Sequence, residues 1–159
     1  MRLSLSRHRR CTGKKIPWLD RRTTRRLRET TESMEPAGAD VEVIVVDDAF
    51  IRELNREYRG VDRPTDVLSF SYLDDLDAGG PPRGRRTAGE VYVSCETVET
   101  RARAEGVAPE RFFLRVGVHG LLHVVGYDHE TRSETGEMES EERRLLLQHL
   151  TSSEVEELF

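Results

Sequence analysis

The stretch of sequence that says most about the fold is PERFFLRVGVHGLLHVVGYDH, which covers residues 109–129. Pro109 suits the first turn of a helix, and Gly126 can adopt the left-handed conformation that closes one. The second half of the intervening segment is apolar on almost every side of a helical projection. Because a helix that is apolar all round is buried, we predict a central helix between Pro109 and Gly126.

Strand-like and helical segments alternate around this helix and are joined by short connections. Runs of β-branched and aromatic residues predict strands at residues 41–46, 67–72 and 89–94, and Leu3 and Leu5 allow a further short one. Spacing and capping residues predict helices that start near Pro17, Asp47, Ser94 and Glu134, the last of them running to Leu150. We therefore expect an α+β fold, with α/β as the alternative, in which helices cover one mixed sheet.

Size and composition suit one domain over residues 1–159. The chain has 159 residues, of which 36% are hydrophobic and 35% are charged. No apolar run approaches the ~20 residues that cross a bilayer. The start of the chain is basic without the apolar segment of a secretory signal, although an arginine-rich start also resembles an organelle transit peptide. The two cysteines form no C-x-x-C motif and suit reduced thiols. We expect a cytoplasmic protein that does not enter a membrane.

Charge is divided unevenly along the chain. Residues 1–28 contain eleven Lys and Arg and one acid, a net charge of +10, whereas residues 29–159 contain fourteen Arg and twenty-nine acids, a net charge of −15. Together they give the formal net charge of −5. A basic segment on an acidic body is typical of a surface that contacts phosphates, and equally of a solvated terminus that contacts nothing. Charge alone leaves both interpretations open.

Three of the five histidines lie within eleven residues, at His119, His123 and His129. Residues four apart on a helix share a face, so His119 and His123 point the same way. Gly126 lets the chain turn, and His129 can then approach the same point from the other side. Three imidazoles with an open fourth position are typical of a catalytic zinc site. A single buried histidine is usually a core residue, but this cluster favours a bound metal: zinc, or else nickel, copper or iron.

The histidine spacing also matches H-E-x-x-H-x-x-G-x-x-H, which is a zinc-binding signature of metalloproteases. In those enzymes the residue after the first histidine is a glutamate that acts as the general base. The corresponding residue here is Gly120, which has no side chain. A metalloprotease is therefore the less favoured interpretation. Gly117 and Gly120 lie three residues apart, which favours close packing of the helix against a neighbour.

Two long segments resemble a known family. Residues 119–129 read HGLLHVVGYDH and resemble the H-G-x-L-H-x-x-G-Y-D-H signature of the YbeY family of zinc-dependent endoribonucleases. Residues 54–70 read LNREYRGVDRPTDVLSF and resemble the family's L-N-x-x-Y-R-x-x-D-x-P-T-[DN]-V-L-S-F. GEVYVS and EMESEE agree with shorter motifs of the family. The likeness lies within a core over residues 41–150, whereas residues 1–35 carry no recognisable motif and residues 73–88 look like a variable loop.

The resemblance implies an α+β fold and one zinc ion held by His119, His123 and His129. It implies cleavage of single-stranded RNA, with the small ribosomal subunit and its ribosomal RNA as partners in RNA maturation and ribosome quality control. It also implies that Arg59 is needed for activity. Asp128 either orients a ligand histidine or caps a turn.

Arg59 suits this chemistry on physical grounds as well. Cleavage of a phosphodiester places negative charge on the phosphoryl oxygens, and a guanidinium group can bind two of them at once. The alternative is a surface arginine paired with Asp62 or Glu57. Thr65 and Asp66 either line a cleft or shape the turn before the next strand.

Three hypotheses about function remain. The first is a zinc endoribonuclease with His119 and Arg59 as catalytic residues. The second is a ribosome-assembly factor whose metal is structural and which acts by binding. The third is a metalloprotease, which Gly120 disfavours.

Overall fold

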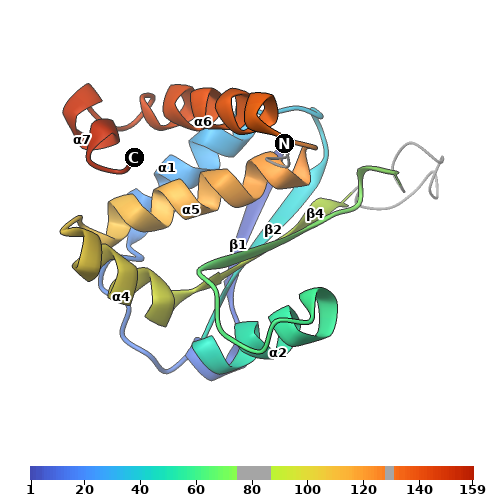
Figure 1. The fold of residues 1–159 in the computed structure, drawn as a ribbon, viewed down its shortest axis with the longest axis vertical. Helices are drawn as coiled ribbons and strands as arrows, with labels where there is room; N and C mark the ends of the chain where they lie inside the picture. The colour runs from blue at the N-terminus through green and yellow to red at the C-terminus, as the bar shows by residue number, and fades with distance from the viewer. Residues whose placement is uncertain (75–86, 128–130) are drawn as a thin grey trace.

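The computed structural model describes residues 1–74, 87–127 and 131–159 (Figure 1). Most of the predicted loop at residues 73–88 lies outside these ranges. The strands are β1 Arg2–Arg7, β2 Asp40–Val46, β3 Val67–Ser71 and β4 Thr87–Ser94. The helices are the 3-10 turn η1 Arg9–Cys11, α1 Arg21–Glu32, α2 Asp48–Arg59, α4 Cys95–Glu105, α5 Pro109–Val124, α6 Arg132–Leu146 and α7 Ser152–Glu156.

The strands form one mixed sheet in the order β1-β2-β4-β3. β1 and β2 are parallel, β2 and β4 are parallel, and β3 is antiparallel to β4. The run Val43–Val46 in β2 is buried without interruption, as expected of a strand covered on both faces. The predicted α+β fold with a single mixed sheet is confirmed.

Helices cover the two faces of the sheet. Figure 1 shows α2 on one face and α1, α5, α6 and α7 on the other. α5 packs directly against β3 and β4, and ten of its sixteen residues are buried. Among the described residues, no helix combines the length and the apolar composition needed to cross a bilayer.

Two glycines allow α5 to pack closely against its neighbours. A Cβ atom at Gly120 would lie 2.5 Å from Cγ1 of Val91 and 2.9 Å from Oγ of Ser69, which are both strand residues. A Cβ atom at Gly117 would lie 3.1 Å from a methyl group of Leu27 in α1. The predicted role of Gly117 and Gly120 in close packing is confirmed.

Substitution of Gly120 by alanine is expected to destabilise the protein by about 1–3 kcal/mol, because the new methyl group overpacks the interface between helix and sheet. Gly136 in α6 is a matched control, since a Cβ atom there meets no atom within 4 Å. Gly136→Ala is expected to stabilise by roughly 0.5–1 kcal/mol, because alanine loses less backbone entropy in a helix. Urea unfolding of both variants measures the difference. Equal changes in both would contradict the packing argument.

The basic N-terminal segment is part of the sheet. β1 pairs with β2 along its whole length, from Arg2 opposite Asp40 to Arg7 opposite Val45. Cys11 follows in η1 and is buried, with its Sγ atom 4.0 Å from that of Cys95. The interpretation of this segment as a terminus that contacts nothing is therefore wrong for residues 2–11.

Three predicted helix boundaries differ from the observed ones. α1 begins at Arg21 rather than near Pro17, because the side chain of Asp20 accepts the backbone N–H of Thr23 at 2.7 Å and so caps the helix. The C-terminal helix begins at Arg132 and ends at Leu146 rather than at Leu150. Thr151 then caps the separate short helix α7.

Neither histidine predicted to lie on the surface is fully exposed. The side chain of His149 is only 11% exposed, and this burial lowers its pKa. His8 is half-buried and stacks on Phe50 of α2 with a centroid separation of 4.1 Å. Both belong to packed parts of the molecule because η1 and the end of α6 fold against neighbouring helices.

Candidate metal centre

His119 and His123 lie one turn apart on the same side of α5, as their spacing requires. Their Nε2 atoms are 3.2 Å apart, and the rings meet edge to face with centroids 4.7 Å apart. The two imidazoles, called here the histidine pair, therefore converge on one point. His129, the third predicted ligand, and Asp128 lie outside the described residues.

The second ring nitrogen of each histidine contacts an oxygen atom. Nδ1 of His123 donates to the backbone carbonyl of Tyr127 at 2.9 Å, since a carbonyl oxygen can only accept. Nδ1 of His119 makes a short contact with Oε1 of Glu142, a buried residue of α6. A neutral imidazole that is protonated at Nδ1 has a lone pair at Nε2. Two such lone pairs, on Nε2 atoms 3.2 Å apart, offer two donor atoms to a cation at one point.

This arrangement fits a metal ion bound through imidazole Nε2 atoms. Histidine ligands of metals usually donate their second N–H to a carboxylate or a backbone carbonyl, and these are the two partners present here. Within residues 1–74, 87–127 and 131–159, no three His, Cys, Asp or Glu side chains form a group that could hold a metal. The described part of the centre therefore contains two candidate ligands, His119 and His123.

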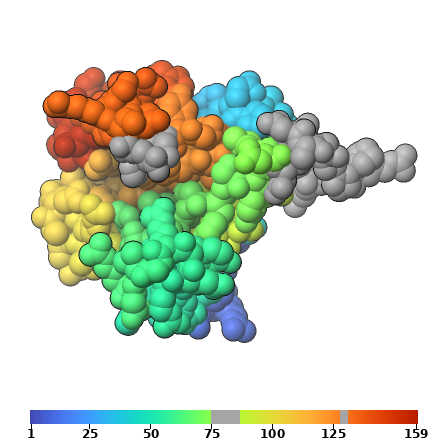
Figure 2. Space-filling view, turned by 45° about the vertical axis from the view of Figure 1, so that its right-hand side comes forward, coloured from blue at the N-terminus to red at the C-terminus, as the bar shows by residue number. Residues whose placement is uncertain are grey.

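Arg59 lies in a different cavity. This Arg59 cavity has a volume of about 350 Å³ and is lined by the second half of α2, residues 61–66 and α4. Neither His119 nor His123 lines this cavity. Figure 2 shows α2, in teal, and α6, in orange, on the same face of the molecule.

The guanidinium group of Arg59 has no ion-pair partner among the described residues. Asp62, the partner expected of a simple surface arginine, instead binds Arg52 through two contacts of 2.8 and 3.0 Å. Gly60 ends α2 with a φ of 68°, so Arg59 is the last helical residue and projects at the exposed end. The interpretation of Arg59 as a partner of Asp62 is wrong.

Thr65 and Asp66 both line a cavity, and Asp66 also shapes the turn before β3. Oδ1 of Asp66 accepts the backbone N–H of Val67 at 2.9 Å and so shapes the entry into β3. Its Oδ2 makes a short contact with Arg101, and both Thr65 and Asp66 line the Arg59 cavity. The carboxylate therefore fixes Arg101 at the wall of this cavity.

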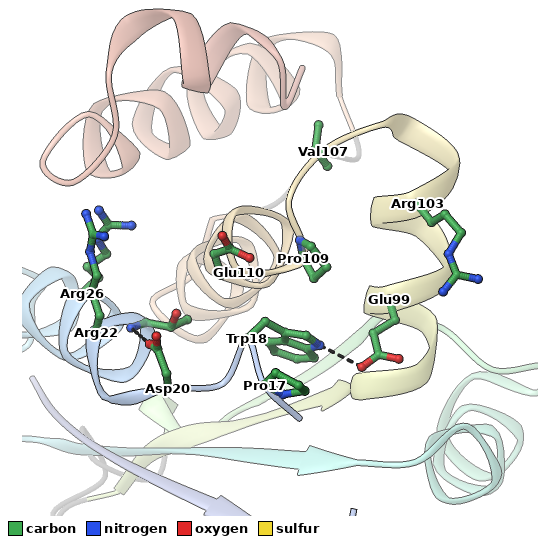
Figure 3. A pocket seen from close by; sticks show the side chains of 11 residues that line it. Pro17, Trp18, Asp20, Arg22, Arg26, Glu99, Arg103, Val107, Pro109 and Glu110 are labelled. Atoms are coloured by element: carbon green, nitrogen blue, oxygen red, sulfur yellow. Dashed lines mark hydrogen bonds between the residues drawn. The ribbon is translucent and has the colours of Figure 1, made fainter. Parts of the chain in front are cut away.

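A larger cavity of about 670 Å³, called here the α1–α4 cleft, was not predicted from the sequence (Figure 3). The indole N–H of Trp18 donates to Oε1 of Glu99 at 2.9 Å. Arg22 and Arg26 of α1 lie on one side and Arg103 of α4 on the other. No local motif marks this cleft, because its walls come from segments about 80 residues apart. The arginine-rich run of α1 was the available signal.

The role of Glu142, the last residue of the EMESEE motif, was not predicted from the sequence. Glu142 occupies a buried position of α6, in a stripe with Met138, Leu145 and Leu146. An acid among the apolar positions of an amphipathic helix was the signal that could have found it.

The fold and the histidine pair define an α+β protein with a candidate metal centre built on imidazole. Comparison with known proteins identifies the family. The family model described as Endoribonuclease YbeY matches residues 13–150, and the chain belongs to this family. The resemblance expected from the two motifs is confirmed, and the match extends into residues 1–35, where no motif was recognisable.

Curated proteins and solved structures are similar to this chain, and three of them illustrate the match. Proteins named Endoribonuclease YbeY from Nitrobacter hamburgensis and Rhodopseudomonas palustris are 39% and 44% identical over 112 and 114 residues, which are 70% and 72% of this chain. The matched stretch covers 59% and 66% of those two relatives' own length. A solution structure of a Thermotoga maritima protein, 32% identical, superposes with a TM-score of 0.59 over 91% of this chain and 86% of its own.

Proposed function

We propose that this protein is a zinc-dependent endoribonuclease that cuts single-stranded RNA. The observation that carries the proposal is the histidine pair, with Nε2 atoms 3.2 Å apart and an oxygen partner on each Nδ1. Membership of the YbeY family and the names of the curated relatives support the same activity. As the family resemblance implies, we propose that the substrate is small-subunit ribosomal RNA in the cytoplasm, where the enzyme acts in RNA maturation and ribosome quality control.

One zinc ion per chain would be held by His119, His123 and His129, with α5 as the central helix that carries the first two ligands. Bound there, zinc would supply a Lewis acid for the phosphoryl oxygens and lower the pKa of a water molecule. Residues of the chain orient the two ligand histidines. The carbonyl of Tyr127 and the carboxylate of Glu142 hold the two imidazole rings in place.

Arg59 is the residue that we propose to bind the reacting phosphate. Its planar guanidinium can donate two parallel hydrogen bonds to phosphoryl oxygens, and these bonds strengthen as negative charge develops there. Arg63 and Arg101 line the same cavity and can contact neighbouring phosphates. The cavity therefore offers a cationic path for an RNA backbone that approaches α2.

Peptide hydrolysis is less compatible with this site. The general base of the related protease signature would occupy position 120, where even a Cβ atom would meet Val91 at 2.5 Å. Glu142 cannot replace that base, because it binds the Nδ1 side of His119 rather than the Nε2 side. The site thus has a metal-binding arrangement without the base that proteases of this signature use.

A cleavage assay tests the proposed function. Purified protein is incubated with single-stranded RNA, structured RNA and casein, with and without a chelator, and His119→Ala is run in parallel. We expect single-stranded RNA to be cut by the native protein alone, only without chelator, and casein to stay intact. Chelator-sensitive hydrolysis of casein would favour the protease. RNA binding without cleavage would favour the assembly factor.

The exposed face of α1 supports RNA as the partner. It carries five arginines, Arg21, Arg22, Arg25, Arg26 and Arg28, and among described residues only Arg25 has an ion-pair partner, Glu29 at 3.6 Å. The opposite face of α1 is buried through Leu27, so no apolar side remains to enter a lipid bilayer. A cationic face without an apolar one suits a phosphate backbone better than a membrane.

Removal of two α1 arginines is expected to weaken the salt dependence of RNA binding. Each phosphate contact on a single strand contributes about 0.7 to the slope of log affinity against log salt, so Arg22→Gln/Arg26→Gln should flatten it by about 1.4. Glutamine keeps nearly the helix propensity of arginine. The control is Arg9→Gln/Arg10→Gln in η1, where Arg10 pairs with Glu53 of α2 on the other face of the sheet. An equal slope of log affinity against log salt in the native protein and in both double variants would show that α1 does not contact RNA.

A further inference from the structure

Glu142 is a carboxylate inside the hydrophobic core. Only 3% of its surface is exposed, and its neighbours in the buried stripe of α6 are Met138, Leu145 and Leu146. Burial of a carboxylate is unfavourable unless nearby groups replace its lost hydration. A leucine would fill the same position without that cost. The partners of the carboxylate therefore indicate what it does.

Two side chains of α5 approach this carboxylate. Oε1 makes a short contact with Nδ1 of His119, while Oε2 lies 4.0 Å from Nε of Arg115. Arg115 has other partners. Its guanidinium group donates to the backbone carbonyl of Leu158, and its Cζ atom lies 4.3 Å from the ring centroid of Phe159. Of the two contacts, only the one to His119 is at hydrogen-bonding distance. The carboxylate is thus directed at the imidazole.

We propose that Glu142 is a positioning residue for His119. By accepting the Nδ1 proton, it holds the imidazole in the Nδ1–H tautomer and fixes the rotation of the ring. The lone pair of Nε2 then points toward Nε2 of His123, whose own tautomer the carbonyl of Tyr127 sets. The identity of the cation bound between them rests on the proposed function. The tautomer is a property of the chain alone.

The geometry assigns Glu142 no direct contact with the reacting groups. Nδ1 and Nε2 lie on different sides of the imidazole ring, so an acid bound at Nδ1 is separated by the ring from anything bound at Nε2. Glu142 is therefore not a ligand of the metal on the Nε2 side, nor a base for water there. Its effect passes through His119, as a fixed orientation and tautomer of the imidazole ring.

Zinc affinity measures this effect without reference to cleavage. Competition with a chromophoric chelator gives the dissociation constant of the native protein, Glu142→Gln and Glu142→Leu. Loss of such an outer partner typically weakens metal binding by about 10-fold to 100-fold. We expect Glu142→Gln near the lower figure, because its amide oxygen can still accept the Nδ1 proton, and Glu142→Leu near the higher one.

Glu139→Gln is the matched control. Glu139 lies one turn earlier on α6, lines the same small cavity beside His119 and is paired with Arg143 at 3.0 Å. This variant removes the same charge without touching the imidazole, so its zinc affinity should be unchanged. Thermal unfolding of the metal-free proteins checks that each variant is folded, and Glu142→Gln, which keeps an oxygen acceptor for His119, should be close to the native protein in stability. Zinc affinity unchanged in Glu142→Leu, or equally reduced in Glu139→Gln, would overturn the proposal.

The tautomer of His119 can be observed directly in metal-free protein. Long-range ¹H–¹⁵N spectra in alkaline buffer, where free imidazole is neutral, distinguish Nδ1–H from Nε2–H. We expect Nδ1–H in the native protein and a shift toward Nε2–H in Glu142→Leu. An Nε2–H tautomer in the native protein would refute the role of Glu142. Failure of the native protein to bind zinc would instead refute the proposed function and leave the tautomer result standing.

Discussion

Arg59→Ala is expected to slow RNA cleavage by a factor of ~10² or more, the usual effect of removing one donor that stabilises charge in a transition state. The fold and the metal content should not change. Arg59 is exposed at the end of α2, and among described residues its removal leaves no carboxylate without a partner. Gly60, which ends the helix, is retained. The loss should therefore appear in the rate and not in stability.

Arg59→Lys should recover only part of the lost rate, because an ammonium group is a point charge and cannot hold two phosphoryl oxygens in a fork. Binding of uncut RNA should fall much less than cleavage, since the interaction is made mainly in the transition state. Single-turnover cleavage and equilibrium binding on the same RNA separate the two effects. Arg56→Ala is the control, because Arg56 is also exposed on α2 but does not line the Arg59 cavity.

One outcome would change the functional hypothesis. If Arg59→Ala and His119→Ala both retain the cleavage rate of the native preparation, the activity belongs to a contaminating nuclease. The assembly factor would then be the leading hypothesis, since it requires RNA binding without cleavage. The salt dependence attributed to α1 would remain valid in that case, because it concerns binding alone.

Local sequence was sufficient to predict a helix, or the end of one, where the residues of a single segment determine its structure. Pro109 and the apolar residues that follow it predicted α5, and Gly126 does adopt the predicted positive φ, at 95°. Gly60 likewise ends α2 in the left-handed conformation. The i, i+4 spacing of His119 and His123 predicted that their side chains meet, since helix geometry alone requires it.

Features that depend on distant segments could not be predicted in the same way. β1 has a weak pattern of its own and becomes a strand because Arg2–Arg7 pairs with β2, nearly forty residues later. The α1–α4 cleft needs both helices and the start of α5. Glu142 is 23 residues from His119 in sequence, and only the packing of α6 on α5 brings them together. The strand, the cleft and the side-chain contact each depend on residues that are distant in sequence.

The same distinction applies to the candidate site. Two of the three predicted ligands converge as their spacing requires, whereas Arg59 lies in a cavity that the histidine pair does not line. Motif spacing is informative about ligands that share a helix. It carries no information about the distance between α2 and α5, which depends on how both helices pack on opposite faces of the sheet.

The metal content of the purified protein follows from the histidine pair. We expect close to one divalent metal ion per chain, bound through imidazole nitrogens at about 2.0–2.1 Å, and nearly complete loss of that metal in His123→Ala. His123 is half-buried at the end of α5, and its Nδ1 contact is to a backbone carbonyl, so alanine leaves no large cavity in the core. The loss should therefore reflect ligation and not unfolding.

Elemental analysis after gel filtration measures the metal, and circular dichroism checks the fold. His8→Ala is the matched control, because His8 stacks on Phe50 beside α2 and contributes nothing to the histidine pair. It should retain the native metal content. A full complement of metal in His123→Ala would show that the ligand assignment is wrong, since a zinc site with an open position has only three protein ligands and cannot lose one without losing most of its affinity.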